Sequence, residues 1–183
     1  MADLVVACVW AGDRYSLDHV RKLRDKAGEY LRRPHTMVCL TDHLERCEGV
    51  TFIDITEASL PGDWATMILF EPGWRDGFKI IYFDLDVSVV GSLAPLADVP
   101  GEFASHDGVM VIGAGLASFV WHGFVRQRSR FMEKYERARE CIAELYPNAT
   151  SLLRLMPKGF FVHEKIIGGT DPGTLHRVVI APR

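Results

Sequence analysis

Two acidic residues follow a strongly apolar segment near the middle of the chain. The segment 80–83 (IIYF) leads directly into Asp84, Leu85 and Asp86. In a regular strand, residues i and i+2 point to the same face, so we expect both carboxylates to lie together at the carboxyl end of a buried strand, where α/β sheets bind ligands. Mg²⁺ or Mn²⁺ would relieve the repulsion between them and could bridge to a phosphate. The pattern predicts a divalent-metal site, and a solvated acidic turn is the alternative.

The elements that must position these acids follow an α/β pattern. Apolar runs predict buried strands at 4–10, 36–40 and 78–83 and further strands at 50–55 and 109–112, and the run at 4–10 is continuous and rich in β-branched residues. Apolar residues at spacings of three and four predict helices at 18–32, 64–70 and 119–146, with a short helical turn at 92–96. Ser16 is the candidate N-cap of the first helix, and Pro34 ends it. We therefore expect a single α/β domain over residues 1–183, with a mostly parallel sheet and helices on both faces.

The last predicted helix carries a set of basic side chains. They are Arg126, Arg128, Arg130, Lys134, Arg137 and Arg139. A solvated helix face explains such a pattern, and a surface that binds an anion or a partner is the second interpretation.

Composition and charge exclude several classes of protein. The 183 residues are 48% hydrophobic and 25% charged, which excludes a collagen-like, coiled-coil or disordered chain. A net charge of -3 gives no general attraction to nucleic acid or anionic lipid. The longest uncharged apolar run, 109–121, is too short for a transmembrane segment, and the first residues lack the basic start of a signal peptide. Because the four cysteines form no CxxC pair, we interpret them as reduced thiols and expect a cytoplasmic protein.

The segment 64–96, WATMILFEPGWRDGFKIIYFDLDVSVVGSLAPL, resembles the GT-A-fold glycosyltransferases, especially the glycogenin-like and bacterial galactosyltransferase-like group. In that group, an apolar helix with an aromatic start precedes a strand that ends in a DxD motif. A valine-rich segment and a Gly-Ser/Asn-Leu-x-x-Leu turn follow, as at 87–90 and 91–96 here. The resemblance covers roughly residues 4 to 112 and implies a GT-A-like, Rossmann-like fold.

The resemblance implies metal-dependent transfer of a sugar from a nucleotide diphosphate sugar, with a UDP-sugar as the first expectation. The acceptor, whether glycan, lipid or protein, is not specified. In such enzymes the DxD acids hold Mn²⁺ or Mg²⁺ on the donor's diphosphate, which offsets the charge of the leaving nucleoside diphosphate. Asp86 would be the closer metal ligand, and Asp84 would bind the metal or touch the ribose.

The same resemblance places the donor at the loop after the first strand. The implied donor-binding residues are Val9, Trp10, Ala11, Gly12, Tyr15, Thr66, Asp84 and Leu85. The first four would supply backbone contacts and Tyr15 an aromatic face for the base, although packing is the alternative for Tyr15 and for Trp10. Thr66 stands where the group often has a basic residue, in a W-x-K pattern.

Three further site residues follow from the resemblance. Asp107, within the segment HDGVM at 106–110, stands near the position of the group's Asn-Ser-Gly-Val-Met segment and would contact the donor sugar or the acceptor, or cap a turn. Glu164 would replace a later sugar-contacting acid, and His163 would complete the metal shell, with His176 as the alternative. The group's His-x-x-Gly-x-x-Lys-Pro-Trp ending does not occur in this sequence.

Two other functions fit the acidic pair. A non-catalytic GT-A-like nucleotide-binding protein agrees with the missing basic residue and the missing ending. A haloacid-dehalogenase-like phosphatase also places a DxD motif after a buried strand, with the first acid as nucleophile and the second as general acid. In that class the motif usually opens the chain, whereas three predicted strands precede Asp84 here, and Asp171 stands without a paired acid.

Overall fold

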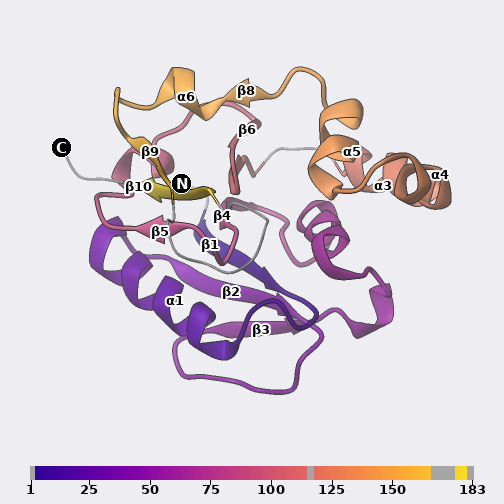
Figure 1. The fold of residues 1–183 in the computed structure, drawn as a ribbon, viewed down its shortest axis with the longest axis horizontal. Coiled ribbons are helices and arrows are strands. Elements are labelled where there is room, and N and C mark those ends of the chain that lie inside the picture. The colour runs from indigo at the N-terminus through magenta and orange to yellow at the C-terminus, as the bar shows by residue number, and fades with distance from the viewer. Residues whose placement is uncertain (1–2, 115–117, 166–175, 181–183) are drawn as a thin grey trace.

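The computed structural model describes residues 3–114, 118–165 and 176–180, and the side chains of residues 3–114 and 118–162. Within this part of the chain, seven strands form a main sheet in the order β3-β2-β1-β4-β7-β6-β8 (Figure 1). Their bounds are β1 Asp3–Trp10, β2 Thr36–Thr41, β3 Thr51–Asp54, β4 Phe78–Phe83, β6 Phe103–His106, β7 Val109–Ile112 and β8 Thr150–Ser151. A smaller sheet has the order β5-β10-β9, from β5 Ser88–Val89, β10 His176–Ile180 and β9 Phe161–Lys165.

The main sheet changes direction beside β4. The neighbours β3, β2, β1 and β4 are parallel, whereas β7 runs antiparallel to both β4 and β6. β8 is parallel to β6, so the sheet is mostly parallel, as expected. Phe83 at the end of β4 pairs with Val109 at the start of β7. This register places the acidic pair after β4 next to the turn that precedes β7.

Helices cover both faces of the sheet, which confirms the predicted α/β architecture. One face packs against η2 (Gly62–Phe70), α3 (Phe119–Arg126), α4 (Arg128–Lys134) and α5 (Ala138–Leu145), and the other against α1 (Leu17–Leu31), α2 (Ala94–Ala97) and α6 (Leu152–Leu155). In Figure 1, α1 runs along the parallel strands, and α3, α4 and α5 gather at the right of the view. Alternate strand residues point to opposite faces. Val9 and Tyr82 therefore face the η2 side, whereas Trp10 and Phe83 face the α1 side.

The predicted first helix is present and begins where its cap residue predicts. Ser16 precedes α1 in an extended conformation, and its backbone N–H donates to His19 Nδ1 at 3.2 Å. The helix ends at Leu31, and Arg32 adopts a left-handed conformation with φ of 51° before Pro34. The predicted helix at 64–70 is also present, as part of the 3₁₀ helix η2, whose residues 64–70 are all buried.

The prediction of one long helix over 119–146 is wrong. This segment forms α3, α4 and α5, with breaks at Gln127 and between Tyr135 and Arg137. Tyr135 and Arg137 are extended, and the Ala138 N–H donates to Asp63 Oδ2 at 2.7 Å instead of to a carbonyl in a preceding turn. The apolar periodicity predicted correctly which residues are buried, because Phe124, Phe131, Ala138 and Ile142 share one core. It could not predict where the helix breaks, because the N–H at the start of α5 bonds to a side chain from another element.

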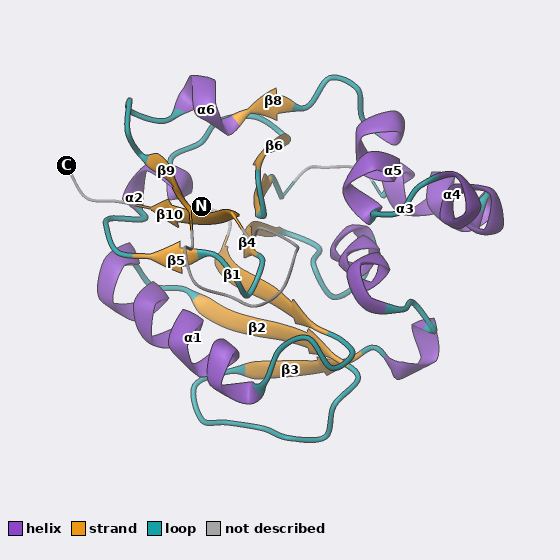
Figure 2. Cartoon of the chain, in the orientation of Figure 1, coloured by secondary structure: helices purple, strands orange, loops and turns teal. Residues whose placement is uncertain are grey.

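Several short elements have no counterpart among the predicted ones. These are the strands β5, β6, β8, β9 and β10, the helix α6 and the 3₁₀ helix η1 (Thr56–Ala58). The β6 sequence, FASH, mixes apolar and polar residues and is too short to show a period. A long loop joins β2 to β3 (Figure 2). No helix in the described ranges is both long and apolar enough to cross a lipid bilayer.

Candidate active site

Asp84 and Asp86 lie in a turn at the carboxyl end of β4. The strand ends at Phe83, and the Val87 N–H donates to the Asp84 carbonyl oxygen at 3.0 Å. The strand geometry assumed from the sequence is therefore wrong for these two residues, because the chain leaves the strand at Asp84. Their position at the end of a central buried strand is as predicted.

The Asp84 carboxylate is held on the η2 side of the sheet. It accepts a hydrogen bond from the Tyr82 hydroxyl, and the Asp84 backbone N–H donates to the Gly108 carbonyl oxygen at 2.7 Å. Burial raises the pKa of Asp84 to about 6; the Tyr82 hydrogen bond opposes this rise, and the charges of Asp86 and Asp63 add to it. A positive charge placed here would stabilise the ionised carboxylate.

The Asp86 carboxylate forms an ion pair with Arg14. Asp86 Oδ2 lies 2.9 Å from Arg14 Nη2, and both side chains are substantially exposed. The Arg14 guanidinium carbon also lies 5.0 Å from the centre of the Tyr15 ring. Burial, followed by the charge of Asp86, raises the pKa of Tyr15. The loop after β1 therefore contacts the acidic turn through a cation and an aromatic ring.

Two cavities meet at Asp84. The larger, of about 170 Å³, is lined by residues of the β6–β7 hairpin and of α5, and we call it the hairpin cavity. The smaller, of about 90 Å³, is lined by the loop after β1, and we call it the loop cavity. Both are lined by Asp63, Thr66, Tyr82 and Asp84. Asp84 therefore stands in the wall between two spaces, at the carboxyl end of β4.

Most of the predicted donor-binding residues converge on the loop cavity. Val9, Ala11, Tyr15, Thr66, Asp84 and Leu85 all line it. Thr66 reaches it from η2, and Val9 reaches it because its side chain faces the η2 side of β1. Residues far apart in the sequence thus form one wall, although their roles toward a donor stay predictions.

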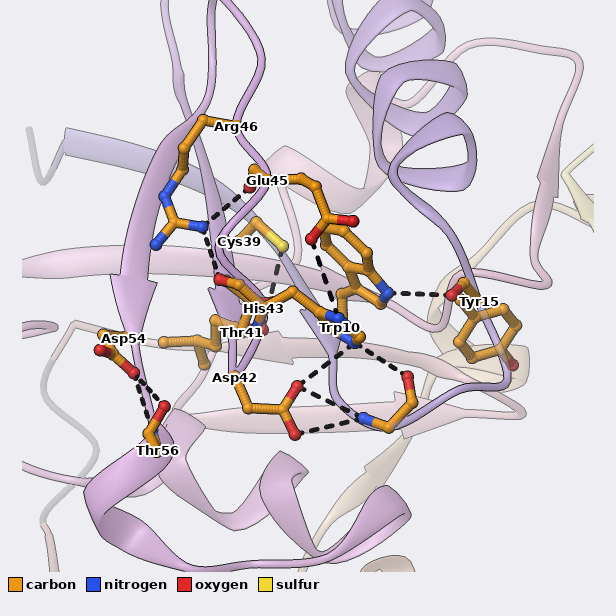
Figure 3. Close-up of polar contacts among 12 residues, drawn as sticks. Trp10, Tyr15, Cys39, Thr41, Asp42, His43, Glu45, Arg46, Asp54 and Thr56 are labelled. Atoms are coloured by element: carbon orange, nitrogen blue, oxygen red, sulfur yellow. Dashed lines mark hydrogen bonds and ion pairs between the residues drawn. The ribbon is translucent and has the colours of Figure 1, made fainter.

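Trp10 has other surroundings (Figure 3), and so does Gly12. The Trp10 side chain is buried on the α1 side; its Nε1–H donates to the Tyr15 carbonyl oxygen at 3.0 Å, and its ring stacks on His43 with centroids 4.1 Å apart. The Gly12 N–H donates to the Asp42 carboxylate at 3.3 Å. Both residues shape the loop that carries Tyr15.

Asp42 and His43 were not predicted as part of this region. They follow β2, which pairs with β1, so the ends of both strands lie together. His43 Nε2 lies 3.0 Å from the Gly12 carbonyl oxygen, and Asp42 accepts from the Gly12 N–H (Figure 3). The sequence signal was the polar Thr41-Asp42 pair that ends a buried strand. These contacts hold the loop after β1 in place.

Asp107 lies at the tip of the β6–β7 hairpin and lines the hairpin cavity with Asp84. Asp107 and Gly108 have positive φ angles of 31° and 76°. A Cβ atom on Gly108 would lie 2.7 Å from Asp84 Oδ2, so only glycine fits between the hairpin and this carboxylate. His106 lines the same cavity and packs against Phe161 with ring centroids 4.7 Å apart. The hairpin therefore brings Asp107 to the same cavity as Asp84, and its role toward a sugar stays a prediction.

Glu164 and His163 lie in β9, and His176 lies in β10. The structure does not describe the side chains of these three residues. Among the side chains that are described, no group of three or more His, Cys, Asp and Glu residues could hold a metal ion. The third protein ligand predicted at His163 therefore stays a prediction.

The acidic pair fits a hard divalent cation by its donor chemistry. Both ligands are carboxylates, and Asp84 is half-buried near the further charges of Asp86 and Asp63. Asp86 would have to exchange its ion pair with Arg14 for the metal. Proteins usually bind Mg²⁺ through one or two carboxylates, and water and phosphate oxygens fill the remaining coordination positions.

Known proteins resemble this chain in structure and not detectably in sequence. No protein-family model matches it, and no curated protein sequence is significantly similar. Apo-form glycosyltransferase GlyE of Streptococcus pneumoniae TIGR4 superposes with a TM-score of 0.55 at 16% identity, covering 82% of this chain and 45% of GlyE. The galactosyltransferase LgtC, in complex with donor and acceptor sugar analogs, superposes with a TM-score of 0.59 at 16% identity, covering 80% of this chain and 72% of LgtC. An active-site mutant of LgtC gives a TM-score of 0.57 at 13% identity.

These structural similarities confirm the GT-A glycosyltransferase fold that the sequence resemblance implied. The chain spans less than half the length of GlyE. Because the sequence identities are low, the comparisons establish the fold and not the activity. The chemistry of this chain has to be argued from its own site.

Proposed function

We propose that this protein is a metal-dependent glycosyltransferase that moves a sugar from a nucleotide diphosphate sugar to an acceptor. A UDP-sugar is the donor that we propose first. The observation that carries the proposal is the position of Asp84 between two cavities, beside Asp86 and opposite Tyr15. Each cavity is smaller than the roughly 300 Å³ of an ordinary small-molecule site. A nucleotide sugar would therefore occupy both, with its diphosphate at Asp84.

The proposed roles follow the order of the two cavities. Tyr15 offers the nucleobase an aromatic face in the loop cavity, and Asp84 and Asp86 would hold Mn²⁺ or Mg²⁺. When bound, that ion would offset the negative charge of the leaving nucleoside diphosphate. Arg14, which is 2.9 Å from Asp86, can turn its guanidinium to the diphosphate and supply the positive charge that Thr66 lacks.

The hairpin cavity would hold the transferred sugar and the attacking hydroxyl of a glycan, lipid or protein acceptor. Asp107 lies at this cavity and would hydrogen-bond either sugar. In the transfer, the acceptor oxygen bonds to the anomeric carbon, and the bond from that carbon to the diphosphate oxygen breaks. The electron pair of that bond leaves with the nucleoside diphosphate, which also takes the hydroxyl proton. Glu164 remains a second proposed sugar contact.

A thermal-shift experiment tests the nucleotide and metal parts of the proposal. UDP with Mn²⁺ should raise Tm clearly, and UDP alone much less, because binding to the folded state stabilises it. Asp86→Asn should remove the Mn²⁺-dependent part of the rise. Asp98→Asn is the matched control, because Asp98 also pairs with an exposed arginine, Arg33, but lines neither cavity. Equal shifts with and without Mn²⁺ would contradict the role of the acidic pair.

Hydrolysis of a UDP-sugar and of a phosphomonoester distinguishes the transferase from the two alternative functions. The transferase should slowly release UDP from a UDP-sugar in the presence of Mn²⁺ and should leave p-nitrophenyl phosphate intact. A non-catalytic nucleotide-binding protein would show the thermal shift without any hydrolysis, and a phosphatase would hydrolyse the phosphomonoester.

A further inference from the structure

Two arginines line the hairpin cavity and have no role in the proposed binding of the nucleotide. Arg137 and Arg139 contribute to the wall of this cavity but not to that of the loop cavity, whereas Asp84 contributes to both. The arginines therefore lie on the side of the site away from the proposed nucleotide. An apolar surface that includes Phe103, Ile142 and Ala149 completes the cavity beside them.

The positions of these arginines are unfavourable for the helix that carries them. Arg137 immediately precedes α5, and Arg139 lies in its first turn. The N-terminal end of a helix carries a partial positive charge, so cations there destabilise the helix. Asp63 and Glu140 supply the favourable carboxylates, because they accept from the N–H groups of Ala138 and Arg137 at 2.7 and 3.3 Å. Helix stability thus gives no reason for either arginine.

Three neighbouring basic residues have partners among the described residues, unlike these two arginines. Arg130 and Lys134 lie 3.4 and 2.6 Å from the Glu144 carboxylate, and Arg128 donates to the carbonyl oxygens of Ala58 and Ser59. Arg137 and Arg139 are exposed, and neither forms an ion pair with any residue that the structure describes. Their charges are available to a ligand in the hairpin cavity.

We propose that the hairpin cavity selects an anionic acceptor, a saccharide that carries a carboxylate or a phosphate, which Arg137 and Arg139 bind. The inference rests on the proposed function, because it assigns the transferred sugar and the acceptor to this cavity. Guanidinium groups match the planar geometry of carboxylate and phosphate oxygens with paired hydrogen bonds. An acceptor held in this way would keep its anion at α5 and turn a hydroxyl toward Asp107 and Asp84.

The test measures binding without a donor. Ligand-observed NMR titrations compare glucuronate, glucose 6-phosphate and glucose, and both anionic sugars should bind at least about tenfold more tightly than glucose. The relative affinities of glucuronate and glucose 6-phosphate show whether a carboxylate or a phosphate is preferred. In the double variant Arg137→Gln, Arg139→Gln, the preference for the anionic sugars should disappear. Arg126→Gln is the control and should keep it, because Arg126 is an exposed arginine that lines neither cavity.

Three results would overturn the inference. The first is that the wild type binds glucose as tightly as its anionic counterparts, and the second is that the double variant keeps the preference. The third is that the double variant loses affinity for UDP to the same degree, which would place the arginines in the nucleotide site. Circular dichroism melts check that the double variant folds, and the two single variants replace it if it does not. Absence of UDP-sugar hydrolysis by the wild type would reject the proposed function separately, because the sugar titrations contain no donor.

Discussion

The guanidinium of Arg14 and the carboxylate of Asp86 lie 2.9 Å apart, although 72 residues separate them in the chain. The pair joins the loop after β1 to the turn after β4, the two segments that would enclose a nucleotide. It also occupies the carboxylate that we propose as the closer metal ligand. Arg14 and a divalent cation would therefore compete for Asp86.

Arg14→Gln should change metal and nucleotide binding in opposite directions. An exposed ion pair contributes at most about 1 kcal/mol, so release of Asp86 should strengthen Mn²⁺ binding by up to about fivefold in the absence of nucleotide. UDP binding in the presence of Mn²⁺ should weaken, because one positive charge near the diphosphate is lost. Isothermal titration calorimetry measures both. Arg21→Gln is the control, since Arg21 pairs with Asp18 on the surface of α1, and a parallel change of both affinities in the Arg14 variant would contradict the competition.

Tyr15→Ala should weaken UDP binding at least about fivefold, because stacking of a base on an aromatic side chain is worth about 1–3 kcal/mol. Tyr15→Phe keeps the ring and should bind UDP nearly as well as the wild type. The comparison separates the aromatic face from the hydroxyl, whose pKa is raised by burial and by the charge of Asp86. A Phe variant as weak as the Ala variant would show that the hydroxyl, and not the ring, matters to the nucleotide.

Asp84→Asn should stabilise the metal-free protein at neutral pH by about 3 kcal/mol. Burial raises the pKa of Asp84 from an ordinary value of 3.8 to about 6 in the folded state. For an acid whose pKa rises on folding, the stability penalty is absent below the lower value and complete above the higher one. The two proteins should thus unfold at similar urea concentrations near pH 3.5 and separate as the pH rises to 7. A variant that is less stable than the wild type at pH 7 would contradict this cost.

Gly108→Ala should both destabilise the fold and impair the acidic turn. Its φ of 76° disfavours a side chain, and the added Cβ would lie 2.7 Å from Asp84 Oδ2. We expect a loss of about 1–3 kcal/mol in the free energy of unfolding and a loss of the Mn²⁺-dependent thermal shift with UDP. Gly77→Ala is a matched control, because Gly77 has φ of 85° but open space around it. If both variants lose only stability, the contact with Asp84 has no part in metal binding.

Much of the sheet could be predicted from the sequence. The strands β1, β2, β4 and β7 are mostly apolar, and such runs are buried on both faces wherever helices cover the sheet. The DxD pattern located the acidic turn because its two residues follow the last apolar residue of β4 directly. Ser16 similarly marked the start of α1. These features are local, so neighbouring residues in the sequence suffice to specify them.

The tertiary structure alone decided how the site is assembled. Asp63 accepts from the Ala138 N–H at the start of α5, and Arg137 and Arg139, which flank Ala138, line the hairpin cavity. The pairing of β4 with β7 brings Asp107 and Gly108 to Asp84, and the ion pair between Arg14 and Asp86 closes the site from the other side. Each of these contacts joins residues from separate elements. Their geometry follows from how the helices and strands pack, which no pattern within a single segment records.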